Sequence, residues 1–142
     1  MKIDKLIPIS KPSIGKKEIE YVTNAIKSGW VSSTGGKYIG IFEEKFAQYC
    51  NTKYAVATSS GTSALHLTLV SLGITSDDEV IVPDFTFVAT ANAVKYIGAK
   101  VVIVDIEEDT LCISPEAIIK AITSRTKAII PVHVYGHPAN MV

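Results

Sequence analysis

The segment "SSGTSALHL" places hydroxyl side chains and a glycine where a predicted strand, residues 54–58, meets a predicted helix. The first N–H groups of a helix have no partner inside the helix, and the helix dipole favours an anion there. Gly61 would let the backbone come close to a ligand, and Thr62 and Ser63 could add hydroxyl donors. The segment therefore fits a phosphate site. Capping of the helix by one of its own hydroxyls explains the same residues equally well.

A second segment, "PDFTFVATANAV", opens the next predicted helix in the same way. Phe85 and Phe87 follow a predicted strand end, and open α/β sheets bind ligands at the carboxyl ends of their strands. One of these rings could stack on a flat ligand. Packing in the core is the more common role of phenylalanine and stays open as the alternative.

The segment "SGWVSSTGGKYI", residues 28–39, reads as a loop that holds the only tryptophan. Trp30 and Ser32 could contact a polar ligand or a partner subunit. A plain surface connection fits the composition equally well.

The histidines at 66, 133 and 137 are too scattered for a local metal site. Those at 133 and 137, with Tyr135, follow a strand end and could line the same cleft, although structural roles are the simpler expectation. No Ser–His–Asp or paired-carboxylate pattern is visible. Cys50 and Cys112 are isolated, and we expect both to be buried free thiols.

Charge and hydropathy narrow the class of protein. Net charge is zero and Arg125 is the only arginine, which argues against a nucleic-acid binder and against an arginine-built phosphate clamp. No apolar run suggests a secretory signal or reaches the roughly 20 residues of a membrane span. We therefore expect a cytoplasmic protein that is not bound to a membrane.

Strand and helix patterns alternate after the first two helices, and the strands are continuous apolar runs. This is typical of an α/β fold whose mainly parallel sheet is covered by helices on both faces. Ser114 and Pro115 mark a helix start. The predicted helices are 16–28, one around 42–49, 61–72, 87–97 and 114–122; the predicted strands are 54–58, 79–83, 100–105 and 127–134.

The length of 142 residues suits one domain with a core of its own. The sequence stops soon after its last predicted strand, with no closing helix. We expect the N-terminal part of a larger protein, with a complete small α/β domain as the alternative.

Five segments, in order and spacing, resemble the pyridoxal-phosphate (PLP)-dependent nucleotide-sugar aminotransferases of fold type I, most closely their perosamine-synthase-like branch. They are "SGWVSSTGGKYIGIFEEKFAQY", "SSGTSALHL", "DEVIVPDFTFVATANAV", "VDIEEDTLCISPEAI" and "PVHVYGHPANM". The resemblance implies that residues 1–142 are the N-terminal part of the PLP-binding large domain, with the remainder of that domain and a small C-terminal domain absent.

The resemblance also implies a reaction. Such enzymes move an amino group from glutamate to a keto group, here C4 of GDP-4-keto-6-deoxymannose, for cell-surface polysaccharide synthesis, and the full-length form is expected to be a homodimer. Gly61, Thr62 and Ser63 inherit the role of holding the cofactor phosphate, and Phe87 that of stacking on the pyridine ring. The loop residues Trp30 and Ser32 become candidates for the substrate side.

Two functional groups of the family have no match in this sequence. The lysine that forms a Schiff base with PLP and the acidic partner of the pyridinium nitrogen lie in the family beyond residue 142. The chain alone is therefore expected to be inactive. A truncated remnant and a sugar dehydratase of the same fold, with histidine in place of the lysine, stay open. A dehydrogenase is disfavoured because no GxGxxG follows a strand.

Overall fold

The computed structural model describes residues 8–32 and 36–142. Its contacts divide the chain into two compact units, Met1–Ala57 and Thr58–Val142, each described by itself. Residues 33–35 of the predicted loop lie outside the described residues. Within the described ranges, no helix combines the length and the apolar character needed to cross a membrane. The assignment of all 142 residues to one domain stays a prediction.

The first unit contains α1 (Lys16–Ser28), with the predicted bounds, and α2 (Lys37–Tyr49), which begins earlier than the helix predicted around 42–49. The loop predicted at 28–39 is therefore too long, because residues 37–39 already belong to α2. The Glu18 carboxylate accepts a hydrogen bond of 2.7 Å from the N–H of Gly15 and so satisfies a free donor at the start of α1. Gly29 ends this helix in the left-handed conformation, at φ 75°, which glycine adopts at little cost. Both ends of α1 are therefore set by local chemistry.

The strand predicted at 54–58 is wrong. These residues form no strand, and Tyr54 and Val56 are 75% and 71% exposed. The N–H of Ala57 donates to the carboxylate of Glu43 at 2.8 Å instead of to a neighbouring strand. A β-strand needs a partner to satisfy its backbone, and no described strand pairs with this segment.

The second unit is built on three parallel strands, β1 (Glu79–Pro83), β2 (Lys100–Val104) and β3 (Thr126–Ile129), in the order β2-β1-β3. The central strand β1 is buried along its whole length, which explains its unbroken apolar sequence. β3 is shorter than predicted. It ends before Pro131, which has no N–H to donate to a ladder, and the chain continues to a short 3-10 helix at Val134–Gly136.

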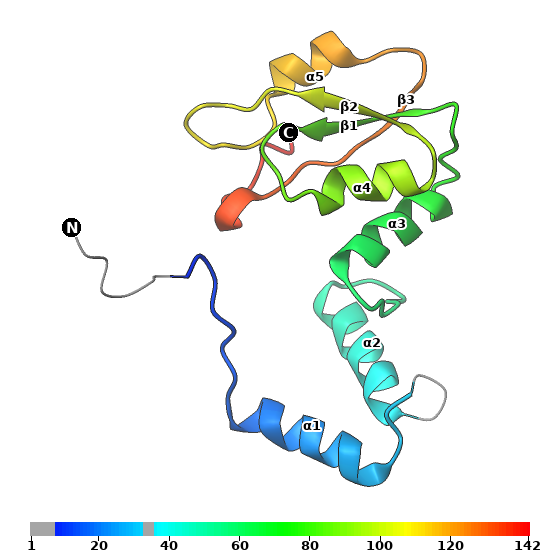
Figure 1. Ribbon diagram of the computed structural model, residues 1–142, viewed down its shortest axis with the longest axis vertical. Coiled ribbons are helices and arrows are strands. Elements are labelled where there is room, and N and C mark those ends of the chain that lie inside the picture. The colour runs from blue at the N-terminus through cyan, green and yellow to red at the C-terminus, as the bar shows by residue number, and fades with distance from the viewer. Residues whose placement is uncertain (1–7, 33–35) are drawn as a thin grey trace, which may run out of the picture. The chain divides into compact units, whose positions relative to one another are not determined.

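Helices cover both faces of this sheet, as predicted (Figure 1). On one face, Val80 and Val82 pack in a cluster with residues of α3 (Gly61–Ser71) and α4 (Ala89–Tyr96). On the other, Ile81 packs in a second cluster that includes residues of α5 (Pro115–Ala121). Neighbouring side chains of β1 thus enter opposite layers, as the pleat of a strand requires.

The two cysteines differ. Cys112 is fully buried in the second of these clusters, as expected for a free thiol. Cys50 is exposed directly after α2, so the prediction that it is buried is wrong. Its place at a helix end, outside any strand or packed helix face, leaves it open to solvent.

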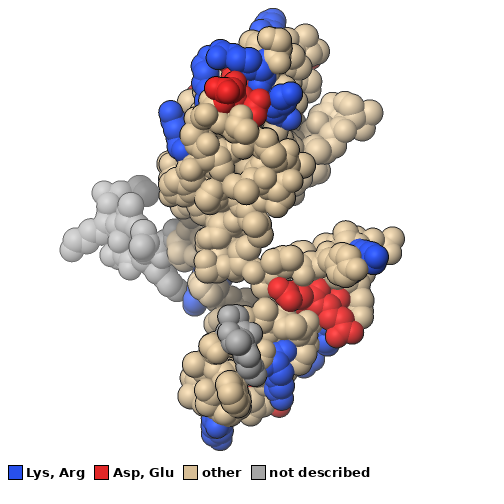
Figure 2. Space-filling view, turned by 90° about the vertical axis from the view of Figure 1, so that its right-hand side faces the viewer, with Lys and Arg blue, Asp and Glu red and all other residues tan. Residues whose placement is uncertain are grey.

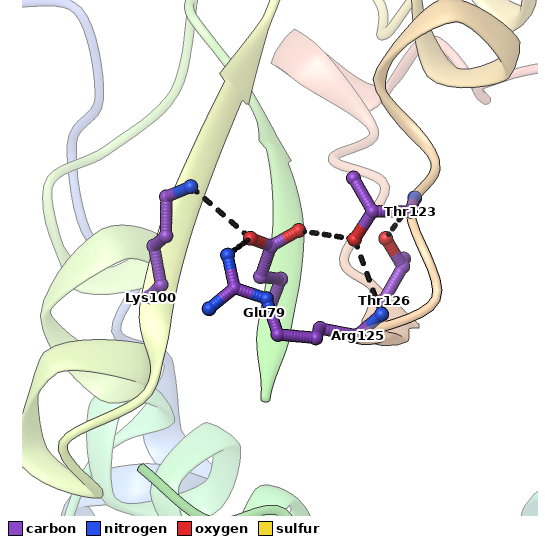
Figure 3. A network of polar contacts seen from close by, with 5 residues as sticks. All are labelled: Glu79, Lys100, Thr123, Arg125 and Thr126. Atoms are coloured by element: carbon purple, nitrogen blue, oxygen red, sulfur yellow. Dashed lines mark hydrogen bonds and ion pairs between the residues drawn. The ribbon is translucent and has the colours of Figure 1, made fainter. Parts of the chain in front are cut away.

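A charged network joins the amino ends of the three strands (Figure 3). The Glu79 side chain is 1% exposed, and its carboxylate accepts from Lys100 at 3.1 Å, Arg125 at 2.6 Å and the Thr123 hydroxyl at 2.7 Å. The bond from Thr123, followed by that from Lys100, lowers the pKa of Glu79. On the face shown in Figure 2, the unit with the sheet gathers its Lys and Arg side chains around a small acidic group and is otherwise largely uncharged.

Candidate functional site

The amino end of α3 is capped by its own serine. Ser60 is extended, and its hydroxyl oxygen accepts from the N–H of Ser63 at 3.2 Å, so the capping role is real for this residue. The N–H groups of Gly61 and Thr62 find no acceptor among the described residues. The cap therefore satisfies one donor and leaves two that an anion could use.

A cluster of hydroxyls lies beside these donors. The Ser63 hydroxyl is 3.1 Å from that of Ser60 and 3.3 Å from that of Ser59. Thr58 donates to the carbonyl of Ser60 at 2.9 Å, which ties the turn together on its other side. The serine hydroxyls are thus held next to the helix start by one another.

A cavity of about 580 Å³ opens between α3 and the segment that leads into α4. It brings together Gly61, Thr62 and Phe87, three of the four predicted cofactor residues, and Ser63 does not line it. Gly61 faces open space, because a Cβ added there would meet no atom within 4 Å. The lining residues are Gly61, Thr62, Ala64, Leu65, Thr68, Phe87, Ala89 and Thr90.

Phe87 is free to meet a ligand. Helix α4 begins at Ala89, two residues later than predicted, so Phe87 lies on the segment before it. Its side chain is 78% exposed, which rules out core packing in the described structure. Phe85 takes a different role, because its ring pairs edge-on with that of Tyr135 at 6.3 Å.

The chemistry of this cavity suits a flat ring that carries a phosphate. Two free N–H groups at the positive end of an 11-residue helix, with the Thr62 hydroxyl, can hold a dianion. The exposed Phe87 ring and the apolar wall can hold an aromatic ring. No charged side chain is among the described lining residues, so a lysine for covalent chemistry is not part of this cavity.

Trp30 and Ser32 belong to the first unit, whereas the Gly61 cavity belongs to the second. They line a separate cavity of about 260 Å³, and Trp30 is 62% exposed. The walls of this second cavity come from α1, the following loop and the start of α2: Val22, Ala25, Ile26, Trp30, Val31, Ser32, Gly36, Tyr38 and Ile39.

Two of the three histidines have structural side-chain contacts. The His133 Nδ1 accepts from the N–H of Ala139 at 3.0 Å, and His66 meets the edge of Tyr96 at 5.8 Å. Neither lines the Gly61 cavity. Across residues 8–32 and 36–142, no three His, Cys, Asp or Glu side chains are grouped to hold a metal ion.

Sequence reasoning missed two threonines of the cavity wall. Thr68 lies about two turns into α3 and Thr90 is the second residue of α4, and neither belongs to a motif that suggests a site. Helical spacing from Thr62 and Leu65 could have placed Thr68 on the same face. Nothing in the sequence placed Thr90 beside them, because that depends on how α3 packs against α4.

Comparison with known proteins identifies the family. The family model described as the DegT/DnrJ/EryC1/StrS aminotransferase family matches residues 12–142. The chain belongs to this family. A relative from Escherichia coli O157:H7, named GDP-perosamine synthase, is 49% identical over 137 residues, which are 96% of this chain and 37% of that protein. The family member described here thus spans little more than a third of the length of that relative.

Solved structures agree with the fold. The PLP form of a sugar aminotransferase from Streptococcus pneumoniae, described as putative, superposes with a TM-score of 0.85 at 37% identity, over 94% of this chain and 34% of that one. A GDP-4-keto-6-deoxy-D-mannose-3-dehydratase of E. coli, with bound hydrated PLP, gives 0.83 at 31% identity, over 94% and 35%. The fold is that of the PLP-dependent sugar-modifying enzymes, as predicted.

Proposed function

We propose that this chain supplies the cofactor-phosphate and ring-stacking part of a PLP-dependent aminotransferase that acts on a nucleotide-linked keto sugar. One observation carries the proposal. A single cavity joins the free N–H groups of α3, the Thr62 hydroxyl and the exposed ring of Phe87. The relative named GDP-perosamine synthase supports a GDP-linked sugar, and we propose GDP-4-keto-6-deoxymannose as the substrate and C4 as the carbon aminated.

Each residue has a defined part. PLP, when bound, supplies the electron sink that lets an amino group move between two carbon skeletons. The N–H groups of Gly61 and Thr62 and the Thr62 hydroxyl bind its phosphate, and Ser63 holds the turn or adds a donor. Phe87 covers one face of the ring and excludes water from it. Trp30 and Ser32 are proposed to contact the sugar nucleotide.

The reaction is tested by supplying the intact gene product with PLP, glutamate and GDP-4-keto-6-deoxymannose. We expect 2-oxoglutarate and an amino sugar in equal amounts. A sugar product that has gained no nitrogen would contradict the proposal. We further propose that glutamate is the donor, that the intact protein is a cytoplasmic homodimer and that its product enters cell-surface polysaccharide.

A second candidate is a dehydratase acting on the same class of sugar. The similarity to the E. coli 3-dehydratase, at a TM-score of 0.83, favours it. The same assay separates the two, since a dehydratase product has lost an oxygen at C3 and gained no nitrogen at C4.

Residues 1–142 alone are proposed to be inactive, because none of the described lysines lines the cavity. Purified residues 1–142 should therefore form no amino sugar under conditions in which the intact gene product does. Turnover by residues 1–142 would contradict this. A remnant without catalytic function is supported if the intact product also fails.

A further inference from the structure

Thr90 is the buried hydroxyl of the cavity wall. It is 5% exposed and lies near the start of α4, whereas Phe87, one turn earlier, is 78% exposed. Both residues line the Gly61 cavity. Burying a hydroxyl costs free energy unless the hydroxyl is hydrogen-bonded. The hydrogen-bond partner of Thr90 therefore indicates why a threonine is stable at this position.

The hydroxyl of Thr90, in the first turn of α4, has a side chain as its partner. Hydroxyls inside helices commonly donate to the carbonyl four residues earlier, and α3 has two examples. Thr68 donates to Ala64 at 2.9 Å and Ser71 to Leu67 at 2.8 Å. The Thr90 hydroxyl instead lies 2.8 Å from the side-chain hydroxyl of Thr86.

This contact fixes the segment that carries Phe87. The Thr86 hydroxyl donates to the Phe87 carbonyl at 3.4 Å, and it can then accept from Thr90. The same Phe87 carbonyl accepts from the N–H of Thr90 at 3.1 Å. Two links thus run from Thr90 to the backbone of Phe87, one through Thr86 and one direct.

We propose that Thr90 is a positioning residue that acts through Thr86 to hold the Phe87 ring over the cofactor cavity. This rests on the proposed function, because it takes PLP as the ligand of that cavity. An exposed phenylalanine on a free segment would lose side-chain and backbone freedom on binding the ligand. The hydroxyl pair removes part of that freedom in advance, so the ring is already placed when PLP arrives.

The test compares Thr90→Val with Thr90→Ser in the intact gene product. Valine keeps the shape and removes the hydroxyl, whereas serine keeps the hydroxyl. Two readouts are taken: the dissociation constant of PLP, and the visible circular dichroism of bound PLP, which reports how the ring is held. We expect Thr90→Val to raise the dissociation constant roughly two- to tenfold and to reduce the dichroism, and Thr90→Ser to restore both.

Thr86→Val removes the same hydroxyl–hydroxyl bond at its less buried residue. A folding defect caused by changing the buried Thr90 would not affect this variant. We expect it to match Thr90→Val, and the double variant to be no worse than either single one. Ser71→Ala, which removes an exposed helix hydroxyl outside the cavity, is the control and should leave both readouts unchanged.

The outcomes separate this inference from the proposed function. Wild-type dichroism in both valine variants, with PLP bound normally, overturns the positioning role and leaves the cofactor proposal intact. Equal loss in Thr90→Val and Thr90→Ser also overturns it, since shape would then matter and the hydroxyl would not. A wild-type protein that binds no PLP overturns both.

Discussion

The hydroxyls at the start of α3 divide into two groups. Ser60 is used by the fold, because its oxygen caps the N–H of Ser63. Thr62 lines the cavity, next to an N–H group that no described residue accepts from. Removing the first kind of hydroxyl should affect stability, and removing the second should affect ligand binding.

Thr62→Ala is expected to weaken PLP binding with little effect on folding. A hydrogen bond to a charged phosphate contributes more than one between neutral groups, so the dissociation constant should rise by about one to two orders of magnitude. Titration of the intact gene product with PLP, followed by absorbance, measures this. Thr62→Ser is the matched control, which keeps the hydroxyl and should bind nearly as the wild type does. Equal affinity in Thr62→Ala and the wild type would remove Thr62 from the proposed site.

How much of this site the sequence could predict depends on the residue. Gly61 and Thr62 could be predicted because hydroxyl residues and a glycine before a leucine-spaced segment mark a helix start, where the first N–H groups are free, although the strand expected before them does not form. The stacking role of Phe87 could be predicted only from the resemblance to the aminotransferase family, because a phenylalanine taken alone is expected to be buried. The presence of Thr90 in the cavity wall could not be predicted, since it depends on how α3 packs against α4.

Among the elements, α5 shows that a capping residue in the sequence can predict where a helix begins. Its predicted cap is confirmed: the Ser114 hydroxyl accepts from the N–H of Ala117 at 3.2 Å and donates to Glu116 at 3.0 Å. The Glu116 backbone N–H, followed by Ser114, lowers the pKa of the Glu116 carboxyl. At seven residues the helix is too short to be stable by itself, so its cap and packing must hold it.

Ser114→Ala is therefore expected to destabilise the second unit by about 1 kcal/mol. The loss arises because the N–H of Ala117 is left without its acceptor. Urea denaturation of the intact gene product, followed by circular dichroism, measures the change. Ser114→Thr keeps a hydroxyl that can accept from that N–H and donate to Glu116, and it should recover most of the stability. A Ser114→Ala midpoint equal to that of the wild type would show that packing alone holds α5.

The helices were predicted better than the strands for a physical reason. A helix satisfies its backbone within its own segment, so spacing, caps and a following glycine suffice, as in α1. A strand needs a neighbour that the local sequence does not contain. Residues 54–58 have the composition of a strand and no described partner, and β3 stops before Pro131 although apolar residues continue.

At the scale of the whole molecule, the two ends of the sheet in the second unit have different roles. The carboxyl ends lead into the segments that carry Phe85, Phe87 and Tyr135. The amino ends are tied by Glu79, which reaches Lys100 on β2 and Thr123 and Arg125 before β3. These bonds join the amino ends of all three strands (Figure 3). They therefore stabilise the sheet whose carboxyl ends lead into the segments that carry the candidate residues.

The Glu79 network predicts a pH dependence of stability. The pKa of Glu79 in the folded state is lowered from its ordinary value of 4.5, chiefly by the Thr123 hydroxyl and then by Lys100. The folded state therefore holds the carboxylate more strongly than the unfolded state does. This contribution is present in full above the ordinary pKa, and it is lost as the pH falls from there through the lowered folded value.

Glu79→Gln should accordingly be less stable than the wild type at neutral pH, and the difference should shrink as the pH is lowered below about 4.5. Urea midpoints of the intact gene product, measured from neutral pH into the acid range, give the two curves. Glu20→Gln, at an exposed position of α1, is the charge-matched control and should track the wild type. Parallel curves for Glu79→Gln and the wild type would mean that Lys100, Arg125 and Thr123 hold the neutral amide as well as the carboxylate. The three strands would then be tied at this end by hydrogen bonding, with no contribution from the charge of Glu79.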